Sequence, residues 1–215
     1  MQTNPLSHFL LTKELFPLLL QSAKEDGDAR IVQHSSMARD MTPDNKGLEE
    51  QYFTKKEKDG MLGGDDNSAG FMKGPQWLRY FQTKLANSVF NQCLHDRLTA
   101  SKNEDCHKVL AVCAHPGIAA TNLGDHLVTG APTPAATEGS FVSQSPEDGA
   151  MGLLKAMMDL IQYRENVAGG TMYGPKGFIG APIVLPSKPH ETDQVAKDML
   201  WKTSEEATGV TFDIE

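Results

Sequence analysis

Apolar side chains recur along the chain with two different periods, and the change between them predicts which segments are helices and which are strands. Residues 4–23 carry apolar positions at helical spacing, and we expect Asn4 to cap this helix with Pro5 at its first position. Residues 30–35 form a short run of strand length. Residues 108–114 are nearly all apolar, which is typical of a buried parallel strand.

The remaining pattern continues this alternation. Further helices are predicted at 75–99, 146–163 and 191–207, a further strand at 170–173, and coil at 174–189. Strands that alternate with helices in this way predict an α/β fold, in which a parallel sheet carries helices on both faces. We expect a single domain over residues 1–215.

Two polar stretches interrupt the alternation. Residues 40–74 are rich in Asp, Lys and Gly and show little periodicity, so we interpret them as a long insertion. Residues 119–145 form a loop region that is rich in Ala, Thr, Pro and Gly. Neither stretch predicts a helix or a strand.

Composition and charge narrow the class of protein. The 215 residues are 39% hydrophobic with a formal net charge of −8 at pH 7, and the mean hydropathy is −0.39. An acidic surface argues against nucleic acid or an anionic membrane as the main partner. No run approaches the roughly 20 apolar residues of a membrane helix, and no signal-peptide pattern opens the chain. We therefore expect a cytoplasmic protein without a transmembrane segment.

The cysteines agree with that compartment. Cys93, Cys106 and Cys113 form no CxxC motif, and their odd number leaves one over in any pairing. This pattern favours buried thiols in a reducing environment over a disulfide framework.

Polar residues follow two of the predicted strands directly. Ser35 and Ser36 end the first strand, and His115-Pro116-Gly117 ends the second. Ligands in open α/β sheets bind at the carboxyl ends of the strands, so both segments are candidates for a site.

Tyr80 and Lys84 stand four residues apart in a predicted helix and therefore share one face. A tyrosine has a pKa of about 10, and a nearby ammonium lowers that pKa because it stabilises the phenolate. Tyr80 can then exchange a proton with a carbonyl or alcohol oxygen, while Ser36 hydrogen-bonds the same oxygen. The hydride for such a reaction comes from a cofactor, because no side chain supplies one.

Tyr52 and Lys56 have the same spacing as this pair. Their surroundings are charged and lack a sustained apolar face, so we interpret them as a solvated loop. His34 and His115 lie beside the candidate site, but no third ligand stands at a metal-binding spacing, so we expect no metal. We assign packing roles to the large side chains Trp77, Trp201, Met151, Met157 and Met158.

Four motifs in a fixed order carry a resemblance to a known family. Residues 80–87, Tyr-Phe-Gln-Thr-Lys-Leu-Ala-Asn, resemble the Tyr-x-x-Ser-Lys-Leu-Ala-Asn signature of the retinol dehydrogenase and protochlorophyllide reductase branch of the short-chain dehydrogenase/reductase family. Residues 30–36 are similar to the catalytic-serine strand of that family, in which the second serine acts. Residues 4–12 match the segment of the family asparagine, and residues 115–121 resemble its Pro-Gly-x-x-x-Thr segment.

The resemblance implies a role for each matching residue. Ser36, rather than Ser35, would be the catalytic serine, and Asn4 would help to hold a water-mediated proton relay to Lys84. Lys84 would also contact the nicotinamide ribose. The implied catalytic residues are Asn4, Ser36, Tyr80 and Lys84, and the implied cofactor-binding residues are Tyr80, Lys84, Pro116, Gly117 and Thr121.

The chain departs from the family pattern in three places. The Thr-Gly-x-x-x-Gly-x-Gly turn that holds the cofactor phosphates is not in the sequence, and the spacing of Gly174, Gly177 and Gly180 does not replace it, because prolines flank those glycines and no helix opens there. The insertion at 40–74 would border the substrate pocket in such a protein, so it is either a lid or a surface excursion. Thr83 stands in place of the usual serine.

We therefore expect the catalytic half of a Rossmann-like doubly wound parallel sheet without its N-terminal glycine-rich half. Such a half exposes the edge of the strand at 30–35, which predicts a homo-oligomer or a partner that supplies the missing half. The resemblance covers nearly the whole chain outside the insertion, including residues 200–209, which resemble the closing helix of the branch.

Two classes of function follow. The first is an NAD(P)-dependent oxidoreductase that acts on a carbonyl or secondary alcohol, with an apolar substrate as one option. The branch resemblance favours NADP(H) over NAD(H), although the residues that would read the ribose 2′ position belong to the absent half. The second is an inactive pseudoenzyme or interaction module.

Overall fold

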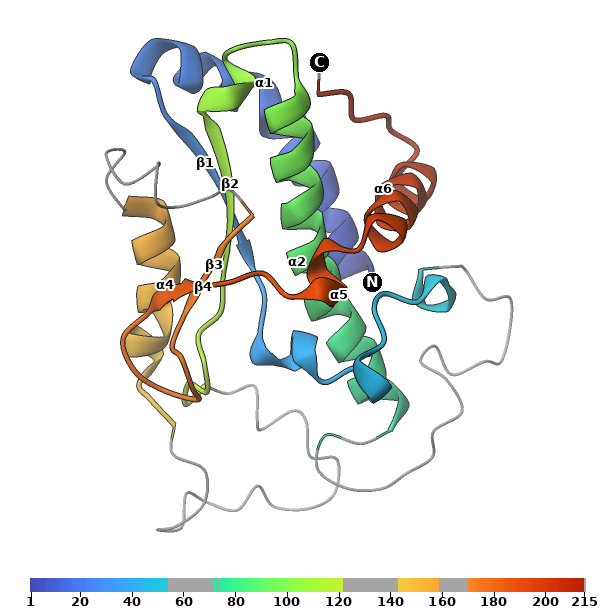
Figure 1. Cartoon of the computed structure of the whole chain (residues 1–215), viewed down its shortest axis with the longest axis vertical. Helices are drawn as coiled ribbons and strands as arrows, with labels where there is room; N and C mark the ends of the chain where they lie inside the picture. Colours follow the sequence, from blue (N-terminus) through green and yellow to red (C-terminus); the bar gives the residue numbers. More distant parts are fainter. Residues whose placement is uncertain (54–71, 73, 122–142, 159–169, 215) are drawn as a thin grey trace.

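Four strands form the central sheet of the computed structural model, which describes residues 1–53, 72, 74–121, 143–158 and 170–214. Strand β1 (Ala29–His34) pairs in parallel with β2 (Val109–Ala114), β2 pairs in parallel with β3 (Met172–Gly174), and β3 pairs antiparallel with β4 (Ile183–Leu185) (Figure 1). The register joins His34 to Ala114, so β1 and β2 end level with each other. The predicted α/β class is confirmed.

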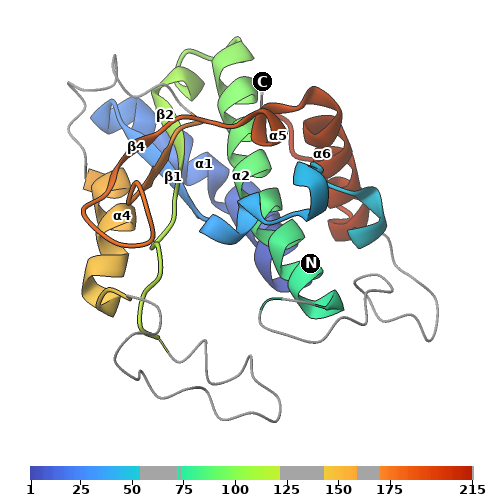
Figure 2. The same cartoon turned by 60° about the horizontal axis from the view of Figure 1, so that its bottom comes forward.

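Helices cover both faces of this sheet. Helices α1 (Ser7–Asp26), α2 (Pro75–Ala100) and α6 (Gln194–Thr208) lie on one side, and α4 (Pro146–Met158) lies on the other (Figures 1 and 2). The side chains of β2 divide between the two faces as the pleat requires. Val109 and Ala111 join the core beneath α1 and α2, whereas Val112 and Ala114 pack with Ala156 of α4. The predicted two-sided arrangement is confirmed.

An aromatic cluster fixes α1, α2 and α6 to one another. The ring of Phe9 lies 5.6 Å from Phe90 and 5.3 Å from Trp201, and Trp201 stacks on Phe212 at 5.3 Å. The guanidinium of Arg97 lies 3.9 Å above the Trp201 ring. Such ring contacts add to the apolar burial. The predicted packing role of Trp201 is confirmed, and these contacts fix α2 relative to α1 and α6.

The helix predicted at 4–23 begins differently from the expectation. The chain opens with a π-helical turn (Gln2–Leu6) in which no side chain caps the helix, so the predicted cap at Asn4 is wrong. The Asn4 amide instead donates a hydrogen bond to the Thr83 hydroxyl at 3.1 Å. A tertiary partner has therefore replaced the local one.

Two predictions near the end of the chain need correction. Residues 174–189 are not all coil, because β4 occupies Ile183–Leu185. The helix predicted at 191–207 is two helices, α5 (Pro189–Thr192) and α6. The break falls at Asp193, whose carboxylate accepts the Ala196 amide at 2.8 Å and so caps α6.

The predicted packing role of the α4 methionines is wrong, because these side chains lie on the surface. Met151, Met157 and Met158 are 46%, 51% and 74% exposed. Helix α4 turns its small residues to the sheet instead, and a methyl group at Gly152 would lie only 3.3 Å from the His115 carbonyl oxygen. Close helix–sheet packing through small residues leaves the methionines outside.

Some predictions fall outside the described residues, including most of the insertion at 40–74, most of the loop at 119–145 and the end of the helix at 146–163. Strand β1 forms one edge of the described sheet. All three cysteines are buried, as predicted. Among the described helices, none has the length and apolarity that crossing a membrane requires.

Candidate active site

The two predicted polar segments lie next to each other at the carboxyl ends of β1 and β2. The serine turn, residues 35–40, follows β1, and the glycine turn, residues 115–117, follows β2. The Ser35 amide donates to the Ala114 carbonyl oxygen at 2.8 Å, which continues the β1–β2 ladder past the end of both strands. The prediction that both segments lie at strand carboxyl ends is confirmed.

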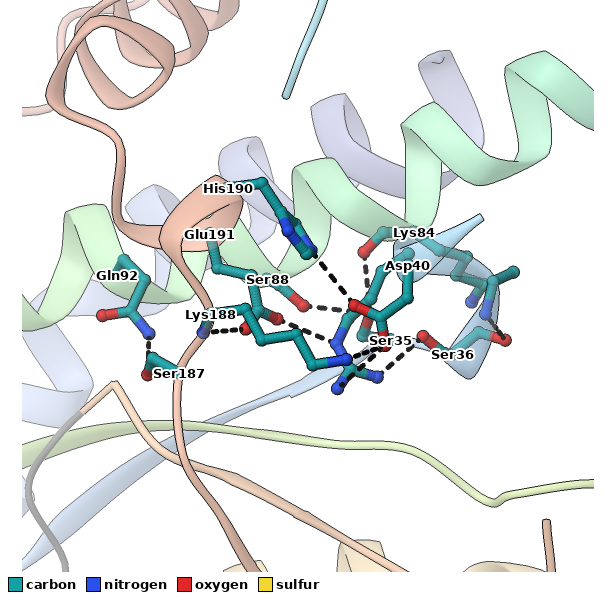
Figure 3. Close-up of polar contacts among 12 residues, drawn as sticks. Ser35, Ser36, Asp40, Lys84, Ser88, Gln92, Ser187, Lys188, His190 and Glu191 are labelled. Carbon is teal, nitrogen blue, oxygen red and sulfur yellow. Dashed lines mark hydrogen bonds and ion pairs between the residues drawn. The ribbon is translucent and has the colours of Figure 1, made fainter. Parts of the chain in front are cut away.

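The two serines of the serine turn have different surroundings. Ser35 is 1% exposed, its hydroxyl donates to the Lys84 carbonyl oxygen at 2.7 Å, and it accepts from Ser88 at 3.1 Å. Ser36 is half-buried, and its hydroxyl oxygen accepts the Ala38 amide at 3.1 Å (Figure 3). Ser35 therefore anchors the turn to α2. Among the described residues the Ser36 hydroxyl accepts one bond and keeps its hydrogen for another acceptor.

Tyr80 and Lys84 lie side by side on α2. The Lys84 ammonium is 6.0 Å from the centre of the Tyr80 ring and donates to the His34 carbonyl oxygen at 3.4 Å. The Asn87 amide donates to the same carbonyl at 2.8 Å. Burial lowers the pKa of Lys84, while Cys113 acts in the opposite direction. The shared face predicted from the spacing is present, and α2 holds it against the end of β1.

Apolar packing brings the serine turn to the same helix. Ala38 is buried with Trp77 and Phe81 of α2, and Tyr80 packs against this cluster. The Tyr80 ring meets Trp77 edge-on at 5.8 Å between ring centres. Ser36, two residues before Ala38, is therefore held close to the Tyr80 turn of α2. The predicted packing role of Trp77 is confirmed.

Asn4 reaches α2 at Thr83, the residue directly before Lys84. Its amide donates to the Thr83 hydroxyl at 3.1 Å, and that hydroxyl donates to the Tyr80 carbonyl oxygen at 2.8 Å. Asn4 thus supports the Tyr80 turn through Thr83. Its implied part in a proton relay to Lys84 stays a prediction.

The glycine turn is shaped by close contacts. His115 is 3% exposed, and its Nδ1 accepts the Gly117 amide at 3.1 Å. Gly117 has φ +66°, and a methyl group there would lie 2.4 Å from the Phe178 carbonyl oxygen. The Pro116 carbonyl oxygen accepts the Gln144 side-chain amide at 2.6 Å. A side chain at position 117 would therefore collide with the backbone at Phe178, and the Pro116 carbonyl is fastened to Gln144.

The other predicted residues of the site lie at or beyond its border. Thr121 is exposed and is the last described residue before position 143. Lys56, from the rejected Tyr52 pair, lies outside the described residues. Gly177 and Gly180 lie between β3 and β4, so no helix starts at the glycine spacing, as predicted.

A buried ion pair beside the serine turn was not found from the sequence. Arg39 Nε lies 2.8 Å from Glu191 Oε1, and both side chains are almost fully buried. The partners are 152 positions apart, and each stands in an ordinary polar stretch. The sequence signal was limited to a cation three residues after the serine pair.

The comparisons with known proteins come from sequence and from structure. No protein-family model matches the chain. An uncharacterized oxidoreductase of Schizosaccharomyces pombe is 33% identical over 124 residues, which is 57% of this chain and 30% of that protein. The crystal structure of an uncharacterized protein from Mycobacterium paratuberculosis is 27% identical with a TM-score of 0.62, and covers 98% of this chain and 58% of that one.

A second solved structure is more distant. The NADPH-bound carbonyl reductase from chicken fatty liver is 19% identical with a TM-score of 0.48, covering 83% of this chain and 54% of that one. A likeness this low assigns no chemistry. This chain therefore spans less than two thirds of each of the three relatives.

Proposed function

We propose that these residues form the catalytic part of an NAD(P)-dependent oxidoreductase of the short-chain dehydrogenase/reductase type, which interconverts a carbonyl and a secondary alcohol. The observation that carries the proposal is the placement of Tyr80 beside Lys84 on α2, with the Ser36 turn packed on the same helix. The related oxidoreductase of Schizosaccharomyces pombe supports the general class.

In the proposed reduction, Tyr80 donates its phenolic proton to the carbonyl oxygen of the substrate. The Lys84 ammonium stabilises the phenolate that remains, because opposite charges at this range favour each other in a partly buried site. Ser36 donates its hydroxyl hydrogen to the same substrate oxygen as negative charge develops there. The hydrogen bond that the Ala38 amide donates to the Ser36 oxygen polarises that hydroxyl and makes it a better donor.

The donor set also fits a nicotinamide cofactor at one end. Lys84 uses one hydrogen on the His34 carbonyl oxygen, and two further hydrogens suit the hydroxyl groups of a ribose. Gly117, Pro116 and Thr121 are the proposed neighbours of the nicotinamide carboxamide. When bound, the cofactor supplies the hydride. NADP(H) is the proposed form, on the branch resemblance.

We propose that the cofactor phosphates are held by a further segment, whether joined to this chain or carried by a different chain. Two observations support this part of the proposal. Strand β1 is an edge of the described sheet, and the solved relative from Mycobacterium paratuberculosis extends well beyond the matched part. An added strand on β1 would complete the pairing of its backbone.

The test combines cofactor binding with turnover. Calorimetric titration with NADPH and NADH should show saturable binding that Lys84→Ala abolishes. In a screen of apolar carbonyl substrates, Tyr80→Phe should lower turnover by roughly a hundredfold to ten-thousandfold, the range of general acid–base catalysis, and leave cofactor affinity similar. Tyr52→Phe is the matched control, because Tyr52 has the same spacing to a lysine but lies in a 3₁₀ turn (Glu50–Tyr52).

Unchanged turnover in Tyr80→Phe would contradict the assignment of the acid. If the segment that holds the phosphates is present and the folded protein still neither binds cofactor at about millimolar concentration nor turns over any carbonyl, the inactive interaction module is favoured instead. Absence of binding by these residues alone would point to the missing segment or a partner.

A further inference from the structure

The Arg39–Glu191 ion pair joins the serine turn to the C-terminal part of the chain. Arg39 is 3% exposed and Glu191 is 2% exposed. Arg39 belongs to the 3₁₀ turn Met37–Asp40, directly after Ser36, whereas Glu191 belongs to α5. Removing two charges from water is costly, so a pair buried this deeply is retained only where good geometry satisfies both partners.

Both partners are in fact satisfied. Arg39 Nε donates to Glu191 Oε1 at 2.8 Å, and Arg39 Nη1 donates to the Ser36 carbonyl oxygen at 3.1 Å. The second oxygen of Glu191 accepts the Lys188 backbone amide at 2.7 Å. The planar guanidinium can make these bonds at fixed angles, which a lysine could not do.

The neighbouring Asp40 repeats the link between the same two segments. Its carboxylate lies 2.6 Å from the Lys188 ammonium and 3.1 Å from His190 Nε2, and 3.6 Å from the Arg39 guanidinium (Figure 3). The serine turn is therefore fastened to residues 188–191 at two consecutive positions. These outer contacts are partly exposed, so they contribute less than the buried pair.

The buried pair acts on the backbone of Ser36 itself. The Ser36 carbonyl oxygen accepts both the Arg39 backbone amide at 3.2 Å and the Arg39 guanidinium at 3.1 Å. The Ser36 hydroxyl oxygen accepts the Ala38 amide at 3.1 Å. The direction of the Ser36 hydroxyl is thus set by a turn that is itself bonded to Glu191 through Arg39.

We propose that Arg39 and Glu191 are positioning residues for Ser36, and that they couple the position of its hydroxyl to the position of α5. The inference rests on the proposed function, in which Ser36 donates to the substrate oxygen. A donor works only within hydrogen-bond reach of the place where charge develops. Loss of the guanidinium leaves the Ser36 carbonyl oxygen with the backbone amide of residue 39 as its donor, and this weaker hold lets the hydroxyl move from that place.

The test removes both charges together, because a single variant would leave a buried charge without its partner and unfold the protein. In the double variant Arg39→Met with Glu191→Gln, methionine keeps an unbranched apolar stem at position 39, and glutamine has the shape of glutamate, so its oxygen can still accept the Lys188 amide. We expect a melting temperature within a few degrees of the wild type, an unchanged cofactor KM, and kcat lower on the order of tenfold to a hundredfold.

A second readout does not depend on activity. The Ala38 amide is bonded to the Ser36 hydroxyl, so its hydrogen exchange, followed by NMR, reports the order of the serine turn. In the double variant this exchange should be faster by about tenfold or more. Lys197→Gln is the matched control, because it breaks an ion pair that joins α6 to Asp96 of α2 away from the serine turn. It should leave kcat and Ala38 exchange unchanged.

The outcomes separate this inference from the proposed function. If Tyr80→Phe abolishes turnover while the double variant keeps wild-type kcat or wild-type Ala38 exchange, the positioning role is wrong and the proposed function stands. If Tyr80→Phe also leaves turnover unchanged, the proposed function fails and the inference falls with it. Lower kcat with faster exchange in the double variant alone supports the inference.

Discussion

The serine turn and the glycine turn end neighbouring parallel strands, yet two different kinds of interaction hold them. In the serine turn the anchors are polar, with the Ser35 hydroxyl on α2 and the Arg39 guanidinium on Glu191. In the glycine turn the anchors are mainly steric, since Gly117 lies where a side chain would collide with backbone. The serine turn should therefore be sensitive to the loss of a polar group, and the glycine turn to added volume or charge.

The functions proposed for the two turns fit this difference. A hydroxyl that must point at a substrate oxygen gains from hydrogen bonds, because these fix direction. A segment that lies along a flat nicotinamide ring gains from a tightly packed backbone with no side chain in the way. Three predictions test the contrast, and they are ordered by the size of the expected effect.

The largest effect is expected from a proton on His115 in the glycine turn. Burial, and next the positive charge of Arg39, lower the pKa of His115 to about 4 from 6.5. The unfolded chain therefore binds more protons between these values, so this contribution to stability is complete above pH 6.5 and is lost as pH falls towards 4. The loss amounts to about 3 kcal/mol of unfolding free energy.

Urea unfolding at about pH 7.5 and about pH 4.5, compared between the wild type and His115→Gln, isolates this contribution. Glutamine is close to histidine in size and carries a side-chain acceptor, but it does not titrate. The charged and titratable neighbours that influence His115, namely Arg39, Asp40, Lys188 and His34, are the same in both proteins. The stability of the wild type should fall more steeply with acid, and parallel pH curves would contradict the prediction.

The next effect is expected from added volume at Gly174. This residue ends β3, and a methyl group there would lie 2.4 Å from His115 Nε2 and 2.6 Å from its Cδ2. The ring is buried and cannot swing away without moving the glycine turn. We expect Gly174→Ala to lower the unfolding free energy by about 2 kcal/mol, within the usual cost of overpacking.

Gly177→Ala is the matched control three residues later. Nothing lies within 4 Å of a methyl group at Gly177, so the change should be neutral or add a few tenths of a kcal/mol through the unfolded state, roughly. Chemical denaturation of both variants measures the contrast. Equal stabilities would show that the glycine turn adapts to added volume, and would contradict the claim that steric contacts hold it.

The sequence predicts the elements better than it predicts their contacts. Residues 108–114 match β2 almost to its ends, because a continuous apolar run has one outcome in a sheet covered on both sides. Strand β4 was missed because three residues between prolines are too short for a period to show. The exposed Met151 was misplaced because composition does not tell which side of an apolar helix meets the sheet.

The site shows the same limit. Spacing placed Tyr80 and Lys84 on one face, since four residues along a helix return to the same side. The partner of Asn4 could not be predicted in this way, because Thr83 lies 79 positions away. The Arg39–Glu191 pair could not be predicted for the same reason, because its partners are 152 positions apart and only the fold brings them together.

The smallest effect on stability, and the sharpest on function, is expected from the two serines. Ser35→Ala removes a buried hydroxyl that bonds Lys84 and Ser88, which should cost about 1 kcal/mol of unfolding free energy. Ser36→Ala should instead lower turnover by roughly a hundredfold to a thousandfold, the cost of removing one donor to a developing oxyanion. Denaturation and turnover measured on both variants would separate an anchor from a catalytic donor. Equal losses of turnover would show that the polar contacts of the serine turn do not distinguish its two hydroxyls.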